Sequence, residues 1–237
     1  MLAHVDAVRR AQPRVGTRKL QDHLAVRGVP VGRDRLFTCL RETGRLVKRK
    51  RRATQTTYAR HGYAVAPNRL KTVTVTAPGQ VVVSDITYLR LARGTFAYLF
   101  LVTDLYSRRI LGWHVSRDLS HHAALVALDA AAQALGPGTG VVHHSDRGSQ
   151  YCCHEYLQQL DAHRMIPSMT DEQHCYQNAV AERVNGILKD EFDLDAEFPS
   201  VTDAQHAVGE AITTYNTVRT HWSLGLQTPH TVFHQAA

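Results

Sequence analysis

The chain is poor in cysteine and has none of the spacings on which cysteine-dependent folds are built. It holds four cysteines in 237 residues. Cys152 and Cys153 are adjacent, which makes a disulfide between them impractical, and no C-x-x-C pair occurs, so a reduced intracellular protein is favoured. The amino-terminal region offers only His4, His23 and Cys39, one ligand short of a tetrahedral zinc site and wrongly spaced for it. A disulfide scaffold and a structural zinc module are both excluded.

Long apolar runs are missing as well. No stretch approaches the roughly 18 apolar residues that a transmembrane helix needs, and the first residues do not follow a signal-peptide pattern. The hydrophobic fraction of 43% and the mean hydropathy of −0.28 are those of an ordinary soluble protein. We therefore expect a cytoplasmic protein with no membrane partner.

Acidic residues are scarce in the first 60 residues. This segment carries sixteen Lys or Arg against four Asp or Glu, a balance of +12, whereas the rest carries twelve against seventeen, a balance of −5. A basic arm on a mildly acidic body is typical of a nucleic-acid-binding module joined to a different kind of domain. A solvated basic tail is the alternative that charge alone leaves open.

Residues 14–44 predict two short helices around a turn. Gly16-Thr17 offers a cap, and Leu20, Leu24 and Val26 give the first helix an apolar face. Residues 27–32 contain two glycines and a proline, which end that helix.

The second helix, residues 33–43, turns Leu36, Phe37 and Leu40 to one side and arginines elsewhere. This order fits a helix-turn-helix that reads DNA, and a hairpin that only packs on the core is the alternative.

A basic arm and a linker follow the helices. Five consecutive cations repel one another and are seldom packed, so we expect an extended arm along phosphates. The predicted DNA-binding cations are Arg33, Arg35 and Arg41 on the second helix and Lys48, Arg49, Lys50, Arg51 and Arg52 in the arm. Little periodicity follows, which predicts a division into a DNA-binding segment (1–52), a linker (53–78) and a main domain (79–237).

The main domain has the element order of a mixed α/β fold with one central sheet. The expected strands are 80–91, 95–105, 108–115, 140–144 and 165–169, and the expected helices are 121–135, 150–163, 176–192 and 203–216. This order brings the ends of the first and fourth strands side by side, with the helix from 176 across them.

Three carboxylates stand at the points where these elements meet. Asp85 lies in a β-branched run, Asp146 lies just beyond the fourth strand, and Glu182 lies in the late helix, with 35 residues between the last two. Hard oxygen ligands suit Mg²⁺ or Mn²⁺, and two such ions about 3.5–4 Å apart can stabilise both the attacking and the leaving oxygen at a phosphodiester.

The phrases SDITYLR, HHSDRGSQY and YQNAVAERVNGILKDEF contain these carboxylates. In this order they resemble the catalytic core of bacterial insertion-sequence transposases of the D-D-E superfamily, and in particular the second-reading-frame product of the large family that moves through circular intermediates. The resemblance covers residues 14–233. It implies a ribonuclease H-like integrase core, divalent-metal-dependent cleavage and strand transfer at element ends, and a nucleoid-associated enzyme. It also implies that Asp85, Asp146 and Glu182 are catalytic and hold one or, as we expect, two Mg²⁺ or Mn²⁺ ions.

Further residues near the three carboxylates are candidates for supporting roles. Asn178 and Asn185 share a helical face with Glu182 and are expected to orient its carboxylate or to touch a phosphate. Lys189, farther along the same helix, is a predicted DNA contact, whereas Glu191 is expected to be a solvated helix residue.

Other candidates lie beside Asp146 and in two family-like phrases. Arg147 and Gln150 are expected to hold phosphate or bases, and His144 either contacts DNA or is a satisfied core histidine. Asp104 is expected to stabilise a turn. The remaining candidates, expected to brace the core with DNA contact as the alternative, are Asn216, Arg219 and His221.

The resemblance also carries expectations about partners. They are double-stranded DNA, both element ends and target, a second copy of the chain on DNA, and an upstream-frame protein or fused segment. Because relatives encode that segment ahead of the helix-turn-helix, we expect this chain alone to show little end specificity. Two alternatives remain: a DNA-binding regulator that does not cut, and a ribonuclease H-like nuclease without strand transfer.

Overall fold

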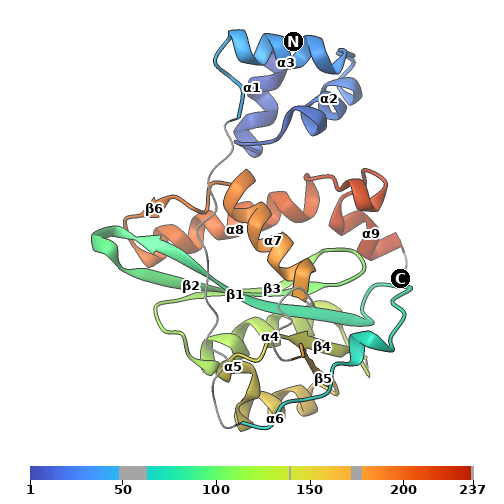
Figure 1. The fold of residues 1–237 in the computed structure, drawn as a ribbon, viewed down its shortest axis with the longest axis vertical. Helices are drawn as coiled ribbons and strands as arrows, with labels where there is room; N and C mark the ends of the chain where they lie inside the picture. The colour runs from blue at the N-terminus through green and yellow to red at the C-terminus, as the bar shows by residue number, and fades with distance from the viewer. Residues whose placement is uncertain (48–62, 139, 172–177, 236–237) are drawn as a thin grey trace.

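A central sheet lies between two layers of helices, and a small group of helices sits beyond one of these layers (Figure 1). The computed structural model describes residues 1–47, 63–138, 140–171 and 178–235. Within this part of the chain, no helix is both long and apolar enough to cross a bilayer.

The elements follow the predicted order closely. The strands are β1 (Val81–Leu91), β2 (Phe96–Asp104), β3 (Ile110–Ser116), β4 (Val142–Ser145), β5 (Ile166–Met169) and β6 (Glu197–Phe198). The α-helices are α1 (Leu2–Ala11), α2 (Thr17–Val26), α3 (Arg33–Glu42), α4 (His121–Leu135), α5 (Ser149–Cys152), α6 (His154–Ala162), α7 (Ala179–Glu191), α8 (Val201–Thr217) and α9 (Pro229–Gln235). Short 3₁₀ turns are η1 (Arg69–Lys71), η2 (Ala92–Gly94) and η4 (Trp222–Leu224).

The strand order is β3-β2-β1-β4-β5, with β6 paired to the far end of β1. β1 runs antiparallel to β2 and parallel to β4, so the first and fourth strands are neighbours, as predicted. This mixed sheet, covered by helices on both faces, has the ribonuclease H-like arrangement that the resemblance implied.

One face of the sheet packs against α7 and α8. Leu89 and Leu99 of the strands join Val184 and Leu188 of α7 and Val208 of α8 in a buried cluster. Because strand side chains alternate between faces, the odd-numbered residues of β1 point toward this layer.

The opposite face packs against α4 and α6. Val82, Phe100 and Val102 of the strands form a second cluster with Leu128 of α4 and Tyr156 of α6. The alternation along β1 therefore separates Val82 on this face from Leu89 on the other.

The amino-terminal helices have their own apolar core. The buried residues of this core are Val5, Val8, Val15, Leu20, Leu24, Leu36 and Leu40. The first of these helices, α1, was not predicted. Two expectations are wrong, since Val26 is 89% exposed and Phe37 is 42% exposed. Both residues lie on the outer side of helices whose inner face is already filled by leucines at helical spacing.

Other differences from the sequence prediction lie outside the core pattern. The helix expected over 150–163 is two helices, because Cys153 between them has an extended backbone (φ −70°, ψ 156°). β6 and α9 were not predicted. Part of the predicted linker packs on the main domain: the Arg69 backbone N–H donates to the Ser168 hydroxyl at 2.9 Å, and Lys71 pairs with Asp171 at 2.6 Å.

Candidate active site

Asp85 is positioned by the middle of β1. It shares the face of Leu89, so its side chain is directed toward α7. The parallel register pairs Val83 with His144, and continuing it by two residues brings Asp146 level with Asp85. Adjacent strands lie about 4.8 Å apart, so the two carboxylates are neighbours at the end of β4.

Asp146 is held by the tight turn that follows β4. Its Oδ1 accepts a hydrogen bond from the Gly148 backbone N–H at 2.9 Å. A Cβ at position 148 would lie 3.1 Å from that same oxygen and 3.0 Å from Gln150 Oε1. The absence of a side chain at Gly148 therefore lets the backbone approach the Asp146 carboxylate closely.

α7 carries the third carboxylate and is tied to β1 by two asparagines. The Asn178 amide donates to the Ser84 carbonyl at 3.0 Å, and the Asn185 amide donates to Asp85 Oδ2 at 2.7 Å. Both asparagines are buried, whereas Glu182, in the first turn of α7, is exposed. Asn185 therefore orients Asp85, which is not the carboxylate that we expected it to serve.

The charges of Asp146 and Glu182 both affect the pKa of Asp85. Burial, the negative charge of Asp146 and, more weakly, that of Glu182 raise the pKa of Asp85 to about 7, while the hydrogen bond from Asn185 lowers it. Lys189 lies near enough for its charge to matter, because burial lowers the pKa of Lys189 while Asp195 and Asp85 raise it. Burial and the neighbouring Asp146 carboxylate thus keep Asp85 protonated to a higher pH than an ordinary aspartate.

The donor set fits a divalent cation with oxygen ligands. Among the described residues no three His, Cys, Asp or Glu side chains converge closely enough to enclose an ion. Mg²⁺ needs less, since it is commonly held by one or two carboxylates together with water and substrate phosphates. The buried Oδ1 atoms of Asn178 and Asn185 have no hydrogen-bond partner in the described structure, and Asn185 lies directly against Asp85, so its Oδ1 is a further oxygen acceptor at this site.

Three further predicted site residues lie around Asp146. His144 is fully buried, its Nδ1 lies 2.9 Å from the Ser168 hydroxyl, and burial lowers its pKa to about 4. Arg147 Nε donates to the Thr170 carbonyl at 2.8 Å, and the Gln150 amide donates to the Leu119 carbonyl at 3.1 Å. His144 is therefore packed in the core, and the other two bind neighbouring backbone.

The predicted cations of the helix-turn-helix are only partly covered by the structure. Arg33, Arg35 and Arg41 are exposed on α3, and Arg33 pairs with Asp34 at 2.9 Å. The basic arm, residues 48–52, lies outside the described residues. The exposure of the α3 arginines is compatible with DNA contact, which stays a prediction.

The bracing residues behave as expected. Asp104 is fully buried and accepts hydrogen bonds from the Gly79 N–H and from the N–H and hydroxyl of Ser107, so it stabilises the turn after β2. The Asn216 side chain bonds both backbone groups of Ile110 at 3.0 and 2.9 Å.

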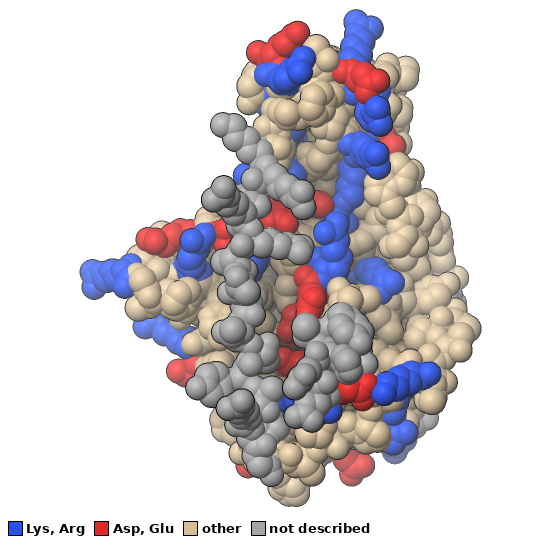
Figure 2. All heavy atoms as spheres, in the orientation of Figure 1, with Lys and Arg blue, Asp and Glu red and all other residues tan. Residues whose placement is uncertain are grey.

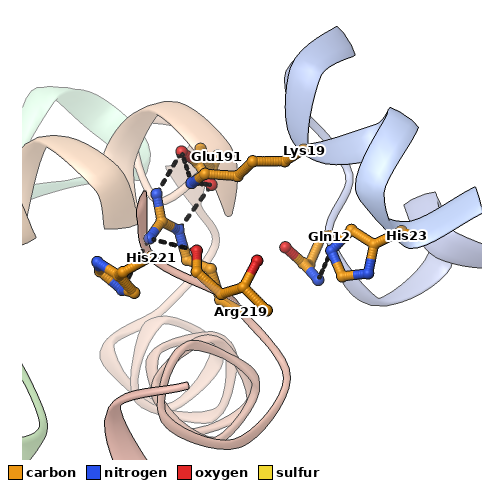
Figure 3. A network of polar contacts seen from close by, with 7 residues as sticks. Gln12, Lys19, His23, Glu191, Arg219 and His221 are labelled. Atoms are coloured by element: carbon orange, nitrogen blue, oxygen red, sulfur yellow. Dashed lines mark hydrogen bonds and ion pairs between the residues drawn. The ribbon is translucent and has the colours of Figure 1, made fainter. Parts of the chain in front are cut away.

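Glu191 was expected to be solvated, and this is wrong. Its carboxylate accepts two hydrogen bonds from Arg219, at 2.8 and 2.7 Å, and two from Lys19, at 3.2 and 3.5 Å (Figure 3). Arg219 also lies 2.7 Å from the ring of His221. Arg14 adds hydrogen bonds from its backbone N–H and its side chain to the Glu191 and Asp190 carbonyls. The amino-terminal helices are thereby fastened to the last turn of the helix that carries Glu182.

Comparison with known proteins places the chain among mobile-element proteins. Residues 75–175 match the integrase core domain family, and residues 163–229 match a second integrase core domain family. The chain is 36% identical, over 96% of its length and 83% of the relative's, to an insertion element IS600 uncharacterized 31 kDa protein of Shigella sonnei. It is 35% identical, over 77% of its length, to the transposase InsF for insertion sequence IS3A of Escherichia coli, of which it spans 64%.

Solved structures share the fold at low sequence identity. The catalytic core domain of HTLV-2 integrase in complex with magnesium superposes with a TM-score of 0.53 at 17% identity, covering 67% of this chain and 98% of that one. A simian T-cell lymphotropic virus intasome in complex with a phosphatase regulatory subunit gives a TM-score of 0.59 at 17% identity, covering 93% of this chain and 71% of that one.

Proposed function

Because the chain belongs to the IS3 family of insertion-element transposases with an integrase core, we propose that it cuts phosphodiester bonds at the ends of an insertion sequence and joins the freed 3′ ends to target DNA. The observation that carries this proposal is the alignment of Asp85 and Asp146 on neighbouring parallel strands beneath α7. Glu182 in the first turn of α7 supplies the third carboxylate.

Each residue has a distinct task in the proposed reaction. Asp85, Asp146 and Glu182 would together hold the Mg²⁺ or Mn²⁺ ions. Such ions, when bound, stabilise charge on the attacking and leaving oxygens and favour deprotonation of the nucleophile. Asn185 fixes the orientation of the Asp85 carboxylate through its 2.7 Å hydrogen bond. Gly148 does the same for Asp146 through its backbone N–H.

Cleavage and joining use the same displacement at phosphorus. In cleavage, a water oxygen bonds to phosphorus and gives up a proton, while the bond from phosphorus to the 3′ oxygen breaks and that oxygen takes up a proton to become a hydroxyl. In joining, the freed 3′ hydroxyl loses its proton and bonds to a target phosphorus, while the target's own 3′ oxygen leaves and takes up a proton. One bond forms and one breaks in each step, so no covalent link between protein and DNA is required.

We assign DNA binding to Lys and Arg side chains that surround the three carboxylates or lie on the helix-turn-helix. Arg33, Arg35 and Arg41 on α3 are placed in or beside a groove, and Lys189 contacts a phosphate near Asp85. We also propose that the active form is an oligomer of this chain on DNA and works with an upstream-frame protein or fused segment.

Neutral replacement of the carboxylates tests the catalytic assignment. We expect Asp85→Asn, Asp146→Asn and Glu182→Gln each to abolish cleavage and strand transfer while DNA binding survives, because the amide keeps the shape but not the charge that holds a divalent ion. The measurement is Mg²⁺-dependent cutting and joining of labelled element-end DNA. Glu210→Gln is the matched control, since Glu210 is also an exposed helical glutamate and pairs only weakly, at 3.9 Å, with His206.

The outcome separates the proposal from its alternatives. Wild-type joining by Glu182→Gln would contradict the assignment of that residue. Cutting without joining by the unmodified protein would favour a nuclease, and metal-independent occupation of the ends without cutting would favour a regulator.

A further inference from the structure

Positive charge gathers on the side of α7 that faces the amino-terminal helices. Figure 2 shows Lys and Arg side chains descending from these helices to the middle of this face, where they border Asp and Glu side chains. Three cations have no DNA contact assigned so far: Arg108 and Arg183, which take no part in the site described above, and Lys19, which pairs with Glu191 at 3.2 Å. They come, in that order, from the turn between β2 and β3, from the first turns of α7 and from α2.

The charges of these cations act on two buried side chains, Tyr215 and His221. Burial raises the pKa of Tyr215, and the charges of Arg219, Arg108 and Arg183 oppose that rise. Burial lowers the pKa of His221 to about 3, helped by the charges of Arg219, Lys19 and Arg108.

Lys19 itself responds to the same group of cations. Burial, followed by the charge of Arg219, lowers the pKa of Lys19 to about 8. Glu191 opposes this shift through its charge and its hydrogen bond, and the charge of Arg183 adds weakly to the shift. Arg219 and Arg183 therefore lie close enough to Lys19 for charge repulsion to lower its pKa.

The carboxylates nearest to these cations are already engaged. Glu191 binds Arg219 through both oxygens. Asp104 accepts three hydrogen bonds, from Gly79 and Ser107. Glu191 also pairs with Lys19, so these two carboxylates balance only two of the four cations Lys19, Arg108, Arg183 and Arg219.

Arg108 is the cation whose environment most clearly lacks a partner. Its Nη1 atom is buried and makes no hydrogen bond within the described part of the chain. The residue has φ +66°, a backbone conformation that non-glycine residues rarely adopt, and it is fastened there because its carbonyl accepts from the Tyr215 hydroxyl at 3.1 Å. A strained backbone that holds an unsatisfied cation is a common sign of a ligand contact.

A cavity of about 580 Å³ opens beside Arg108. It is also lined by Val180 in the first turn of α7 and by Ser223 and Gln227 from the carboxy-terminal segment. Val180 and Arg183 are three residues apart and share a helical face, so Arg183 stands next to this cavity. Glu182 lies between them in sequence, which puts the cavity within one helical turn of a proposed metal ligand.

We propose that Lys19, Arg108 and Arg183 form a binding site for backbone phosphates of the DNA strand that runs between the helix-turn-helix and the carboxylates. This inference rests on the proposed function, since it names how the same site holds its substrate. Guanidinium groups suit phosphate because they donate several hydrogen bonds in a planar fork. The site contacts phosphates and not base edges, so it contributes to affinity and to placement of the strand and not to sequence choice.

Salt dependence of DNA binding tests this site independently of catalysis. The full chain is titrated with a short duplex of arbitrary sequence at salt concentrations from about 50 to 200 mM. We expect Arg183→Gln and Arg108→Gln each to reduce the slope of log K against log salt by about 0.9, because each removes one phosphate contact, and to weaken binding roughly eightfold at 0.1 M salt. Arg164→Gln is the control, because Arg164 is an exposed arginine in the turn between α6 and β5.

Slopes for Arg183→Gln and Arg108→Gln equal to that of Arg164→Gln would overturn the proposal. Arg183 is exposed, so Arg183→Gln carries the test alone if Arg108→Gln does not fold. Failure of the catalytic proposal would leave these slopes unaffected, and the two failures are therefore distinguishable.

Discussion

Removal of the Glu191 carboxylate is expected to destabilise the protein far more than removal of a typical surface acid. Arg219 is only 2% exposed, and two of its nitrogens donate to Glu191. After Glu191→Ala, the partners left to Arg219 are the His221 ring at 2.7 Å and the Thr220 carbonyl at 3.4 Å. The guanidinium would then be a buried charge without a counter-ion.

The magnitude follows from the burial of the pair. Breaking a buried ion pair by removing one partner costs about 3–5 kcal/mol, because the remaining charge is neither solvated nor compensated. The matched control is Asp195→Ala, since Asp195 pairs with Arg90 at 3.2 Å while their side chains are 40% and 55% exposed. An exposed pair of this kind contributes about 1 kcal/mol or less.

Urea denaturation measures the loss in free energy of unfolding for both variants. With a slope of about 2–3 kcal/mol per molar urea, the midpoint should fall by roughly 1–2 M for Glu191→Ala and by less than about 0.5 M for Asp195→Ala. Equal midpoint shifts for the two variants would refute the view that Glu191 compensates a buried charge.

The same pair predicts a pH dependence with a definite sign. Burial opposes ionisation of Glu191, but the hydrogen bonds and charges of Arg219 and Lys19 outweigh it and lower the pKa of Glu191. A lowered pKa in the folded state stabilises the protein above the pKa of the unfolded chain, and this contribution is lost as the pH falls through the folded value. The stability difference between wild type and Glu191→Gln should therefore be full at neutral pH and shrink in acid. A difference that grows on acidification would contradict this.

Two further predictions concern the site and the packing of the sheet. Asn185→Ala removes the hydrogen bond that lowers the pKa of Asp85, so the Mg²⁺ concentration for half-maximal cleavage should rise about 10- to 100-fold; an unchanged requirement would show that Asn185 has no such role. Gly112→Ala would bring a Cβ to 2.0 Å from the Ala127 carbonyl and should cost at least about 3 kcal/mol, whereas Gly209→Ala, with its nearest neighbour at 3.5 Å, should stabilise α8 by about 0.5–1 kcal/mol. Urea midpoints that move in the same direction for both glycine variants would disprove this contrast.

Elements with signals in their own sequence were predicted well. α4 has the predicted bounds because the Ser120 hydroxyl caps its first turn and Gly136 has a positive φ of 74° at its end, a backbone conformation that favours glycine. The adjacency of Asp85 and Asp146 was also predictable, because it follows from the order of strands and helices.

Features set by distant partners were not predictable. Arg219 is 28 residues from Glu191 and Lys19 is 172 residues from it, so no local periodicity marks this carboxylate as buried. The unusual backbone of Arg108 and the break at Cys153 likewise occur without a glycine or a proline at the position. Each depends on what the folded chain places next to it.

The attachment of the amino-terminal helices to the last turn of α7 makes this helix a spacer between the proposed DNA-binding segment and the proposed metal site. Glu182 and Glu191 are nine residues apart in one uninterrupted helix, which corresponds to about 13.5 Å along its axis. This is the length of about four base pairs of duplex DNA. One inserted residue would lengthen α7 by about 1.5 Å and rotate one end of the helix by about 100° relative to the other. The length of α7 is thus constrained by what lies at both of its ends, even at positions that touch neither DNA nor metal.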